Sequence, residues 1–491
     1  MKPPLELFAK DLPLLTKVWT SAKAEKIKLY LVGGVLRDLF LGRERENPDF
    51  DFCLKKGAIN FGRNLAKELK AGFVVLDKEN GAARLVKIIK DKQYTLDFTD
   101  FRGKDLRGDL LLRDFTINSM ALSLENIFIG DDLNNLLIDP FGARQDLKNR
   151  LIKVVDKKAF AQDPLRILRA FSFSAIFGFK LDKQVLLLAK SERNKLLDVS
   201  YERIRDELFK ILDTPCAFRF LSLLDKLKIL GIVFPEIERT RNVRQGPYHH
   251  LDVWHHSLET VRQSESILEE LKYNKEIQDY LNEPVSGQRS RRALLKLGAF
   301  LHDIGKPQAL RREDGKTKFH GHERIGFEIT KAIAKRLRLS CDEMESLERM
   351  VLWHLRPGYL GDSEVVTERA KFRYFRDTQN EAVSVLLLSI ADQRSTRGPL
   401  TTKGSRVRHE KTCFSLIKEY FKKKKEKKLI RLINGDDLIR RFKLEPSPLI
   451  GKILREIEEL QAIGKIKTKP EALKTAAKLV HPVREFHSLT G

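Results

Sequence analysis

One short stretch near the N-terminus constrains this chain more than any other. The sequence LVGGVLRD occupies residues 31–38, and DFD follows at residues 49–51. We expect an apolar strand over residues 27–32, ended by Gly33 and Gly34, and then a helix. Because glycine lets the backbone approach a ligand closely and the start of a helix offers free N–H groups, this turn suits a phosphate.

The two acids belong to the same prediction. In an extended segment, residues i and i+2 point to one face, so Asp49 and Asp51 project together while Phe50 faces a core. Neighbouring carboxylates repel each other, and a shared divalent cation relieves that repulsion. The Gly-Gly pair alone is common and is typical of a turn followed by a helix, and the D-x-D pattern alone is typical of a solvated strand end. The ordered pair predicts a nucleotidyl-transfer site.

Composition narrows the choice of partner. A chain of 491 residues suggests two to four domains, and 42% hydrophobic with 33% charged residues is typical of a soluble globular protein. The net charge of +25 favours a polyanion, either nucleic acid or an anionic membrane surface. No apolar run approaches a membrane span and the N-terminus is not a signal peptide, so we expect RNA or DNA. The four cysteines show no paired spacing, which fits a reducing cytoplasm.

The order of patterns indicates an α+β protein. Residues 1–145 alternate short β-rich runs with helical patterns, which predicts a small mixed sheet with helices on one face. Beyond residue 146 strand signals nearly vanish. Residues 239–247 and 401–408 are polar and basic and indicate linkers, and a histidine-rich helical segment lies between them. The lysine-rich run at 422–428 fits a solvated helix face and an RNA contact equally well.

Four further motifs follow the acids. They are RDFTIN at 113–118, DPFG at 139–142 with DL at 146–147, DPLRILR at 163–169, and RIRDELFK at 203–210. In this order and spacing the chain resembles the class II tRNA nucleotidyltransferases, which are the CCA-adding enzymes and their poly(A) polymerase relatives. The resemblance implies a catalytic head over 1–145, a helical neck with base- and RNA-binding motifs over 146–238, and a basic C-terminal region over 401–491 that contacts tRNA.

The resemblance also implies roles for single residues. Asp49 and Asp51 are the catalytic pair and the expected Mg²⁺ ligands, and Asp97 is a candidate third carboxylate. Asp163 and Arg166, which we expect three residues apart on one helix face, would read the base edge, although such a spacing is more often a surface ion pair. Arg203, Glu207 and Lys210 are expected to brace the helices around them. For the RDFTIN motif, the alternative is an ordinary helix start that Asp114 caps. The remaining nucleotide-binding candidates are Gly33, Gly34, Arg37, Arg113, Asp114, Asn118 and Arg169.

Four departures from the family pattern bear on which nucleotides are added. Leu112 stands where a second Arg is usual, Gln162 replaces an acid before Asp163, and Ser172 replaces an Arg in the next helix turn. The connection at 103–108 is much shorter than the flexible loop of full CCA-adding members. That loop is linked in the family to the switch from C to A addition, so addition of CC only or A only remains open.

A second set of residues is typical of a metal site. Imidazole and carboxylate groups recur at the polar edges of apolar helices, and together they suit a divalent transition metal or Mg²⁺. The set resembles the HD phosphohydrolase superfamily over residues 239–400, with His255 competing with His256 for the first position and with Gly305 and Lys306 continuing the pattern. The candidate ligands are His256, His302, Asp303, His322, His354 and Asp392.

The leading hypothesis is therefore an enzyme that adds CMP and/or AMP to the tRNA 3′ end. It would use CTP and ATP by two-metal transfer and carry a second, phosphohydrolase activity, with no membrane association and no obligatory protein partner. The alternatives are a poly(A) polymerase on other RNAs, or chiefly an HD phosphohydrolase with an RNA-binding front half. A non-catalytic RNA-binding protein is disfavoured by the complete ligand sets.

Overall fold

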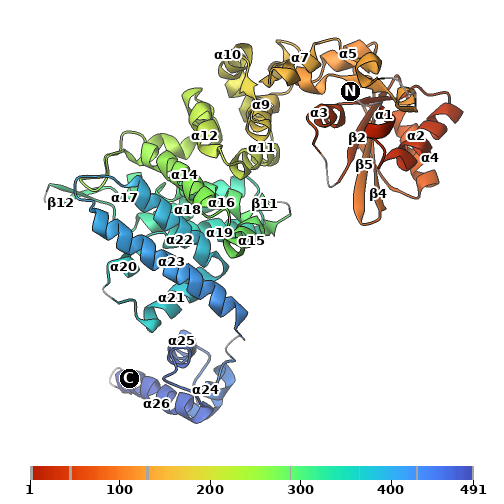
Figure 1. The fold of residues 1–491 in the computed structure, drawn as a ribbon. Coiled ribbons are helices and arrows are strands. Elements are labelled where there is room, and N and C mark those ends of the chain that lie inside the picture. Colours follow the sequence, from red (N-terminus) through yellow and green to blue (C-terminus); the bar gives the residue numbers. More distant parts are fainter. Residues whose placement is uncertain are drawn as a thin grey trace. The chain divides into compact units, whose positions relative to one another are not determined.

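The computed structural model describes residues 4–43, 47–128, 132–287, 289–313, 315–363, 365–426 and 430–488. The chain forms two compact units, which we call the N-terminal unit (Met1–Ile211 and Leu223–Val233) and the C-terminal unit (Leu212–Ser222 and Phe234–Gly491). The expected α+β class is confirmed, because the sheet lies in the N-terminal unit and the rest is largely helical (Figure 1). The finer division into four domains stays a prediction.

The N-terminal unit is built on one mixed, seven-stranded sheet in the order β3-β4-β5-β2-β1-β6-β7. Strands β2 and β5 are parallel, and the other neighbouring pairs are antiparallel. The first strand is shorter than predicted, since it begins at Tyr30 and not at residue 27. The strands are β1 (Tyr30–Val32), β2 (Asp49–Leu54), β3 (Gly72–Asp77), β4 (Ala82–Ile89), β5 (Lys92–Asp100), β6 (Ala121–Ser123) and β7 (Leu137–Ile138).

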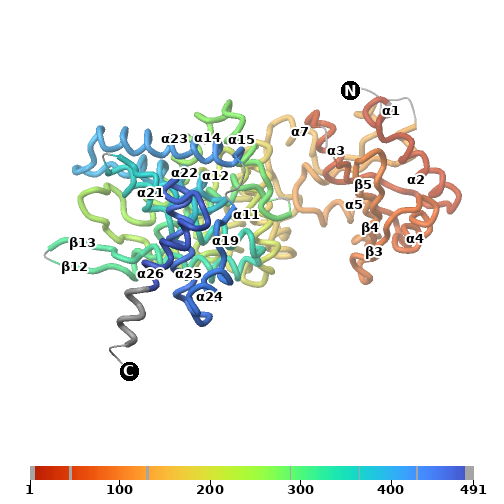
Figure 2. The backbone as a smooth tube through the Cα atoms, turned by 90° about the horizontal axis from the view of Figure 1, so that it is seen from below, coloured from red at the N-terminus to blue at the C-terminus, as the bar shows by residue number. Residues whose placement is uncertain are grey.

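Alternation along the strands gives the sheet one apolar face. Phe52 and Phe98 stack with ring centroids 5.1 Å apart, and both are fully buried. Helix α4 (Ala58–Leu69) packs on β3, β4 and β5, and α2 (Leu12–Ala24) packs on α4. Figures 1 and 2 show both helices on the same side of the strands. The prediction of a mixed sheet covered by helices on one face is confirmed, and the other face is left for polar side chains.

The chain after the sheet is helical, with three short two-stranded ribbons as the other strands that the described part contains. Helices α9 (Leu165–Phe177) and α11 (Tyr201–Asp213) are joined by a hydrogen bond from Ser172 to the buried Glu207. Lys210 lies 2.8 Å from the same carboxylate. The predicted bracing role of the RIRDELFK motif is therefore confirmed, and Ser172 supplies part of the brace.

The C-terminal unit is a helical assembly with a separate small core near its end. Ile453, Ile457 and Ala476 belong to that core. The helices are α14 (Val253–Glu270), α15 (Lys275–Asn282), α16 (Arg291–Leu301), α17 (Lys306–Ala309), α18 (His322–Arg336), α19 (Cys341–Trp353), α20 (Arg356–Gly361), α21 (Glu368–Thr378), α22 (Ala382–Ser395), α23 (Lys403–Lys425), α24 (Gly435–Phe442), α25 (Pro448–Ala462) and α26 (Lys469–Ser488). Over the residues that are described, no helix combines the length and apolarity that a bilayer crossing requires.

The second predicted linker is wrong, and the first is an irregular segment that is partly buried. In the first, Thr240 and Gln245 are buried, so residues 239–247 pack against the unit and do not merely connect two domains. In the second, α23 begins at Lys403, capped by the Thr402 side chain. The polar composition of this stretch reflects an exposed helix face. Of the lysine run, residues 422–425 end α23, whereas Lys427 and Lys428 lie outside the described residues.

Close packing of α17 against α18 depends on one glycine. A Cβ atom on Gly305 would lie 2.2 Å from the His322 carbonyl oxygen and 2.5 Å from the Gly326 nitrogen. Both are backbone atoms, so no side-chain rotation can make room. Gly305, which continues the HD-like pattern, is therefore required here for a steric reason.

We expect Gly305→Ala to destabilise the C-terminal unit by roughly 1–3 kcal/mol, because the two helices must separate. Thermal unfolding followed by circular dichroism measures the loss. Gly358→Ala is the matched control, since a Cβ there meets no atom within 4 Å. Equal melting temperatures for the two variants would contradict the steric argument.

Candidate active sites

The predicted acids meet on the open face of the sheet. Asp51 pairs with Val32 of β1 on one side and with Asp97 of β5 on the other. Since directly paired residues project to the same face, Asp97 lies beside Asp51, and Asp49 shares that face two residues earlier. Phe50 points the other way and is 1% exposed. The alternation inferred from DFD is confirmed, and the parallel pairing brings the candidate Asp97 to the same face.

Asp97 is already held by an arginine. The Arg84 Nε atom lies 2.8 Å from Asp97 Oδ1, and Nη2 lies 2.7 Å from Oδ2. Hydrogen bonding to Asp97 raises the pKa of Arg84, to which the nearby charges of Asp49 and Asp51 also contribute. Both oxygens of Asp97 accept from one guanidinium, so Arg84 already compensates the charge of this carboxylate, and one lone pair on each oxygen remains for a metal ion.

The glycine turn lies directly against the acids. Gly33 has a φ of 77°, and a Cβ atom there would lie 2.9 Å from Asp51 Oδ2 and 3.1 Å from Arg113 Nη1. Only glycine suits both the backbone conformation and the space. An adjacent cavity of about 400 Å³ is lined by Asp51, Phe52, Asp77, Asn80, Ala82, Asp97, Thr99, Arg102 and Arg113.

A chain of buried polar contacts connects α3 (Gly34–Phe40) with α9. Arg37 donates from Nε to Asp38 (2.9 Å) and from Nη1 to the Asn118 side-chain oxygen (2.6 Å). Asn118 in turn donates to Asp114 (2.9 Å), which is 2.8 Å from Arg169. Burial raises the pKa of Asp114, but Arg169 and Asn118 outweigh it and hold the carboxyl below its ordinary value. Four predicted nucleotide-binding residues are thus brought together with Asp38.

The expected arrangement of Asp163 and Arg166 is wrong. Asp163 precedes α9 in an extended conformation, and Pro164 separates it from the helix. Its Oδ2 atom lies 2.9 Å from Arg203, whereas Arg166 donates to the Leu112 carbonyl oxygen at 2.7 Å. The two side chains therefore form neither a shared helix face nor an ion pair, since only Arg166 lies in the first turn of α9.

The short connection at residues 103–108 is compact. Asp105 caps α5 (Leu106–Leu111) by accepting from the Gly108 nitrogen at 2.7 Å. A Cβ on Gly103 would lie 2.5 Å from the Gly108 carbonyl carbon. Asp109, fully buried, lies 3.1 Å from Arg102 and 3.4 Å from Arg113. Residues 103–108 therefore form a compact turn, and the Asp109 carboxylate that follows connects this turn to Arg113 beside the acids.

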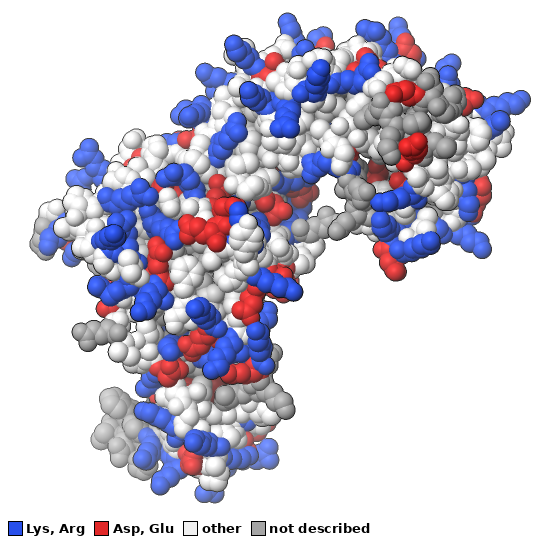
Figure 3. Space-filling model, viewed as in Figure 1, with Lys and Arg blue, Asp and Glu red and all other residues white. Residues whose placement is uncertain are grey.

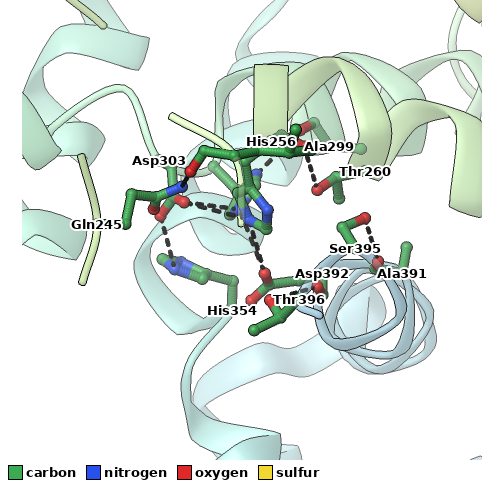
Figure 4. A network of polar contacts seen from close by, with 12 residues as sticks. Gln245, His256, Thr260, Ala299, Asp303, His354, Ala391, Asp392, Ser395 and Thr396 are labelled. Atoms are coloured by element: carbon green, nitrogen blue, oxygen red, sulfur yellow. Dashed lines mark hydrogen bonds and ion pairs between the residues drawn. The ribbon is translucent and has the colours of Figure 1, made fainter. Parts of the chain in front are cut away.

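The second predicted site is assembled from separate segments of the C-terminal unit, and Figure 4 shows His256, Asp303, His354 and Asp392 directed toward one another. Its polar atoms form two groups that could each hold an ion, and within each group the atoms lie within 4.8 Å of one another. His256 Nε2 is 2.9 Å from Asp392 Oδ1, and of the six residues in the two groups only Asp392 is not fully buried. The first group consists of His256, His302 and Asp392, and the second consists of Asp303, His322 and His354. His255 is the exposed neighbour and bonds Asp252, so His256 is the ligand candidate.

The histidines are oriented as metal ligands. The Nδ1 atoms of His302, His322 and His354 lie 2.7–2.9 Å from backbone carbonyl oxygens, so Nδ1 carries a proton and, whenever the ring is neutral, Nε2 is an acceptor. The Nε2 atoms of His322 and His354 are 3.3 Å apart. Two facing lone pairs are unfavourable unless a cation lies between them. Burial lowers the pKa of His354 to about 3, so its imidazole is neutral and Nε2 can offer its lone pair to a cation.

Asp303 serves both groups. Its Oδ2 atom is 3.1 Å from His302 and its Oδ1 atom is 3.3 Å from His322. Burial raises the pKa of Asp303, but the charges of His302 and Lys306 hold it well below the ordinary value. Four imidazoles with two carboxylates fit one or two divalent cations.

Two residues at this site were missed from the sequence. Gln245 accepts from Lys306 at 2.6 Å, and Lys306 also contacts Asp303 at 2.6 Å. The His249 ring meets the His256 ring edge-on, with centroids 4.8 Å apart. Both residues lie in or beside the segment assigned to a linker. The histidine density just before Asp252 was the available signal.

Four family models match the chain in order. They are described as the poly A polymerase head domain (residues 29–153), "Probable RNA and SrmB-binding site of polymerase A" (178–240), the HD domain (253–397) and tRNA nucleotidyltransferase domain 2 (412–477). The first contains the acids and the RDFTIN motif, and the third contains the whole histidine cluster.

Similar proteins agree with these models. An A-adding tRNA nucleotidyltransferase of Deinococcus radiodurans is 29% identical, covering 90% of this chain and 93% of its own. A CC-adding tRNA nucleotidyltransferase of Thermus thermophilus is 28% identical, covering 90% and 91%. The solved Thermotoga maritima CCA-adding enzyme complexed with tRNA superimposes with a TM-score of 0.60 at 23% identity, over 96% of each chain. In its ordered motifs and in these matches, the chain is similar to the class II CCA-adding tRNA nucleotidyltransferases, and its residues 253–397 match the HD domain.

Proposed function

We propose that this enzyme adds CMP and/or AMP to the 3′ end of tRNA, using CTP and ATP and releasing pyrophosphate. The observation that carries the proposal is the pairing of β1, β2 and β5, which sets Asp49 and Asp51 on one open face beside the Gly33 turn. These two carboxylates would hold Mg²⁺. Bound Mg²⁺ would favour loss of the hydroxyl proton and neutralise charge on the leaving pyrophosphate.

The remaining residues position the nucleotide. The backbone at Gly33 and Gly34 would approach the triphosphate, with the Arg113 guanidinium beside the turn supplying positive charge. Arg37 is 7% exposed and bonded to Asn118, so we assign it to orienting that amide and not to gripping phosphate directly. Asp163 would first release Arg203, and Arg166 would release the Leu112 carbonyl oxygen. Both side chains could then bond the edge of the base.

We expect Asp51→Asn to reduce nucleotide addition at least about a thousandfold, because a lost metal ligand removes several kcal/mol of transition-state stabilisation. Incorporation of labelled CTP or ATP into tRNA transcripts ending before CCA, after C, or after CC measures the rate. Asp91→Asn, the same change in the β4–β5 turn, is the control. Full activity of Asp51→Asn would show that the metal lies elsewhere.

The compact 103–108 turn favours restricted addition. A segment fixed by Asp105 and joined to Asp109 has no free length with which to alternate between two nucleotide-binding arrangements. We therefore favour CC-only or A-only addition over complete CCA synthesis. The same three transcripts separate these outcomes, and long A tracts on unrelated RNA would instead identify a poly(A) polymerase.

We expect Asp163→Ala to relax the choice among the four NTPs, because the carboxylate that would accept from a base amino group is lost. The ratio of kcat/KM values for the preferred and the competing NTPs measures the effect, with a change of tenfold corresponding to about 1.4 kcal/mol. Asp198→Ala, an exposed acid of the same unit, should leave the ratio unchanged. Identical selectivity in both variants would remove Asp163 from base reading.

We further propose that the HD cluster is a metal-dependent phosphohydrolase acting on 2′,3′-cyclic or 2′-phosphate ends. The support is chemical, since four imidazoles, three of them oriented by backbone carbonyl oxygens, converge with two carboxylates in a largely buried cluster that Lys306 contacts. A bound divalent cation would supply Lewis-acid activation of the phosphate and of a water molecule. Lys306 would shift from Asp303 to a phosphate oxygen.

We expect His256→Ala to lose bound metal and phosphate release from 2′,3′-cyclic AMP while nucleotide addition stays near wild type. His255→Ala is the matched control, because that histidine is exposed and directed away from the cluster. Elemental analysis of purified protein and a phosphate-release assay give independent readouts. Unchanged metal content in His256→Ala would contradict the ligand assignment.

A further inference from the structure

The segment between the ligand pair His302 and Asp303 and the ligand His322 forms a two-stranded hairpin, β12 (Arg311–Glu313) and β13 (Lys316–Lys318). We infer that this hairpin holds the single-stranded RNA whose terminal phosphate enters the HD site. The inference rests on the proposed phosphohydrolase activity and names its substrate class as a polynucleotide end.

The base of the hairpin is bonded to the metal-ligand cluster. Phe319, the residue after β13, has its carbonyl oxygen 2.8 Å from His322 Nδ1, and Lys306 lies over its ring at 5.7 Å. From this base the two strands project away from the helices, as both views show (Figures 1 and 2). Three residues of strand extend about 10 Å, which reaches past a single nucleotide at the cluster.

The charge on the hairpin is unfavourable for the protein alone. Arg311 pairs directly with Lys318, and like charges in that position destabilise a hairpin. Lys316 shares their face, where Glu313 is the one acid among the described hairpin residues and already bonds Lys318 at 2.8 Å. Basic side chains also gather at the edge of the molecule that carries β12 (Figure 3). A polyanion along this face would relieve the repulsion.

The composition argues for RNA and against a protein partner. Arg311, Arg312 and Lys316 are exposed, and neither strand carries an apolar side chain that a protein interface would bury. Phosphate contacts by exposed lysines and arginines position a strand without reading its sequence. The hairpin would therefore accept RNA ends of any sequence.

Arg311→Glu tests this, because it replaces the repulsive pair with an attractive one and so leaves the hairpin folded. We expect KM for a short single-stranded RNA with a 2′,3′-cyclic phosphate end to rise roughly 3- to 10-fold, with a weaker salt dependence. KM for 2′,3′-cyclic AMP should not change. Lys335→Glu, the same charge reversal at the far end of α18, should affect neither substrate.

An unchanged KM for the RNA in Arg311→Glu, or an equal rise for RNA and mononucleotide, would overturn the inference. Photocross-linking of the full chain to a 4-thiouridine RNA with a 2′,3′-cyclic phosphate end tests the binding surface separately from the proposed hydrolysis. Cross-links within residues 311–318 without any hydrolysis would support the binding surface while the phosphohydrolase fails. Cross-links that avoid the hairpin would overturn the surface whether or not hydrolysis occurs.

Discussion

The pairing of β2 with its two neighbours is the constraint on which the N-terminal unit depends. It places Phe50 and Phe52 in the core and Asp49 and Asp51 on the open face. A register slip by one residue would bury both carboxylates and expose both phenylalanines, at a cost in burial and in charge desolvation. The apolar packing that stabilises the sheet therefore also sets the geometry of the proposed metal site. No separate device is needed to hold the acids together.

Features with a local period could be predicted well from the sequence. Period-2 alternation was enough to orient Asp49 and Asp51, and the order of motifs identified the α+β head. The six HD positions were found because each histidine or aspartate lies at the polar edge of an apolar helical pattern and because their order resembles that of the HD superfamily. His256 could then be separated from His255 only by burial, since the two are adjacent and chemically identical.

Features that depend on long-range contacts could not be predicted. Asp163 and Arg166 have helical spacing, but Pro164 ends that relation and Asp163 bonds Arg203, forty residues away. Gln245 is polar and sits in a basic stretch, and nothing local indicates that it bonds Lys306, sixty-one residues later. The 401–408 segment is rich in charge because its helix is solvated, and composition alone does not separate that case from a linker.

The buried contacts from Asp38 through Arg37, Asn118 and Asp114 to Arg169 have a thermodynamic consequence. Helix α3 follows the glycine turn, and α9 carries Arg166, so a rigid chain of short bonds ties the two. A rotation of α9 would therefore either stretch these bonds or move the Gly33 turn with it. Triphosphate binding at the turn and base contact from α9 would then be coupled, so a substitution that disturbs one of them would also disturb the other.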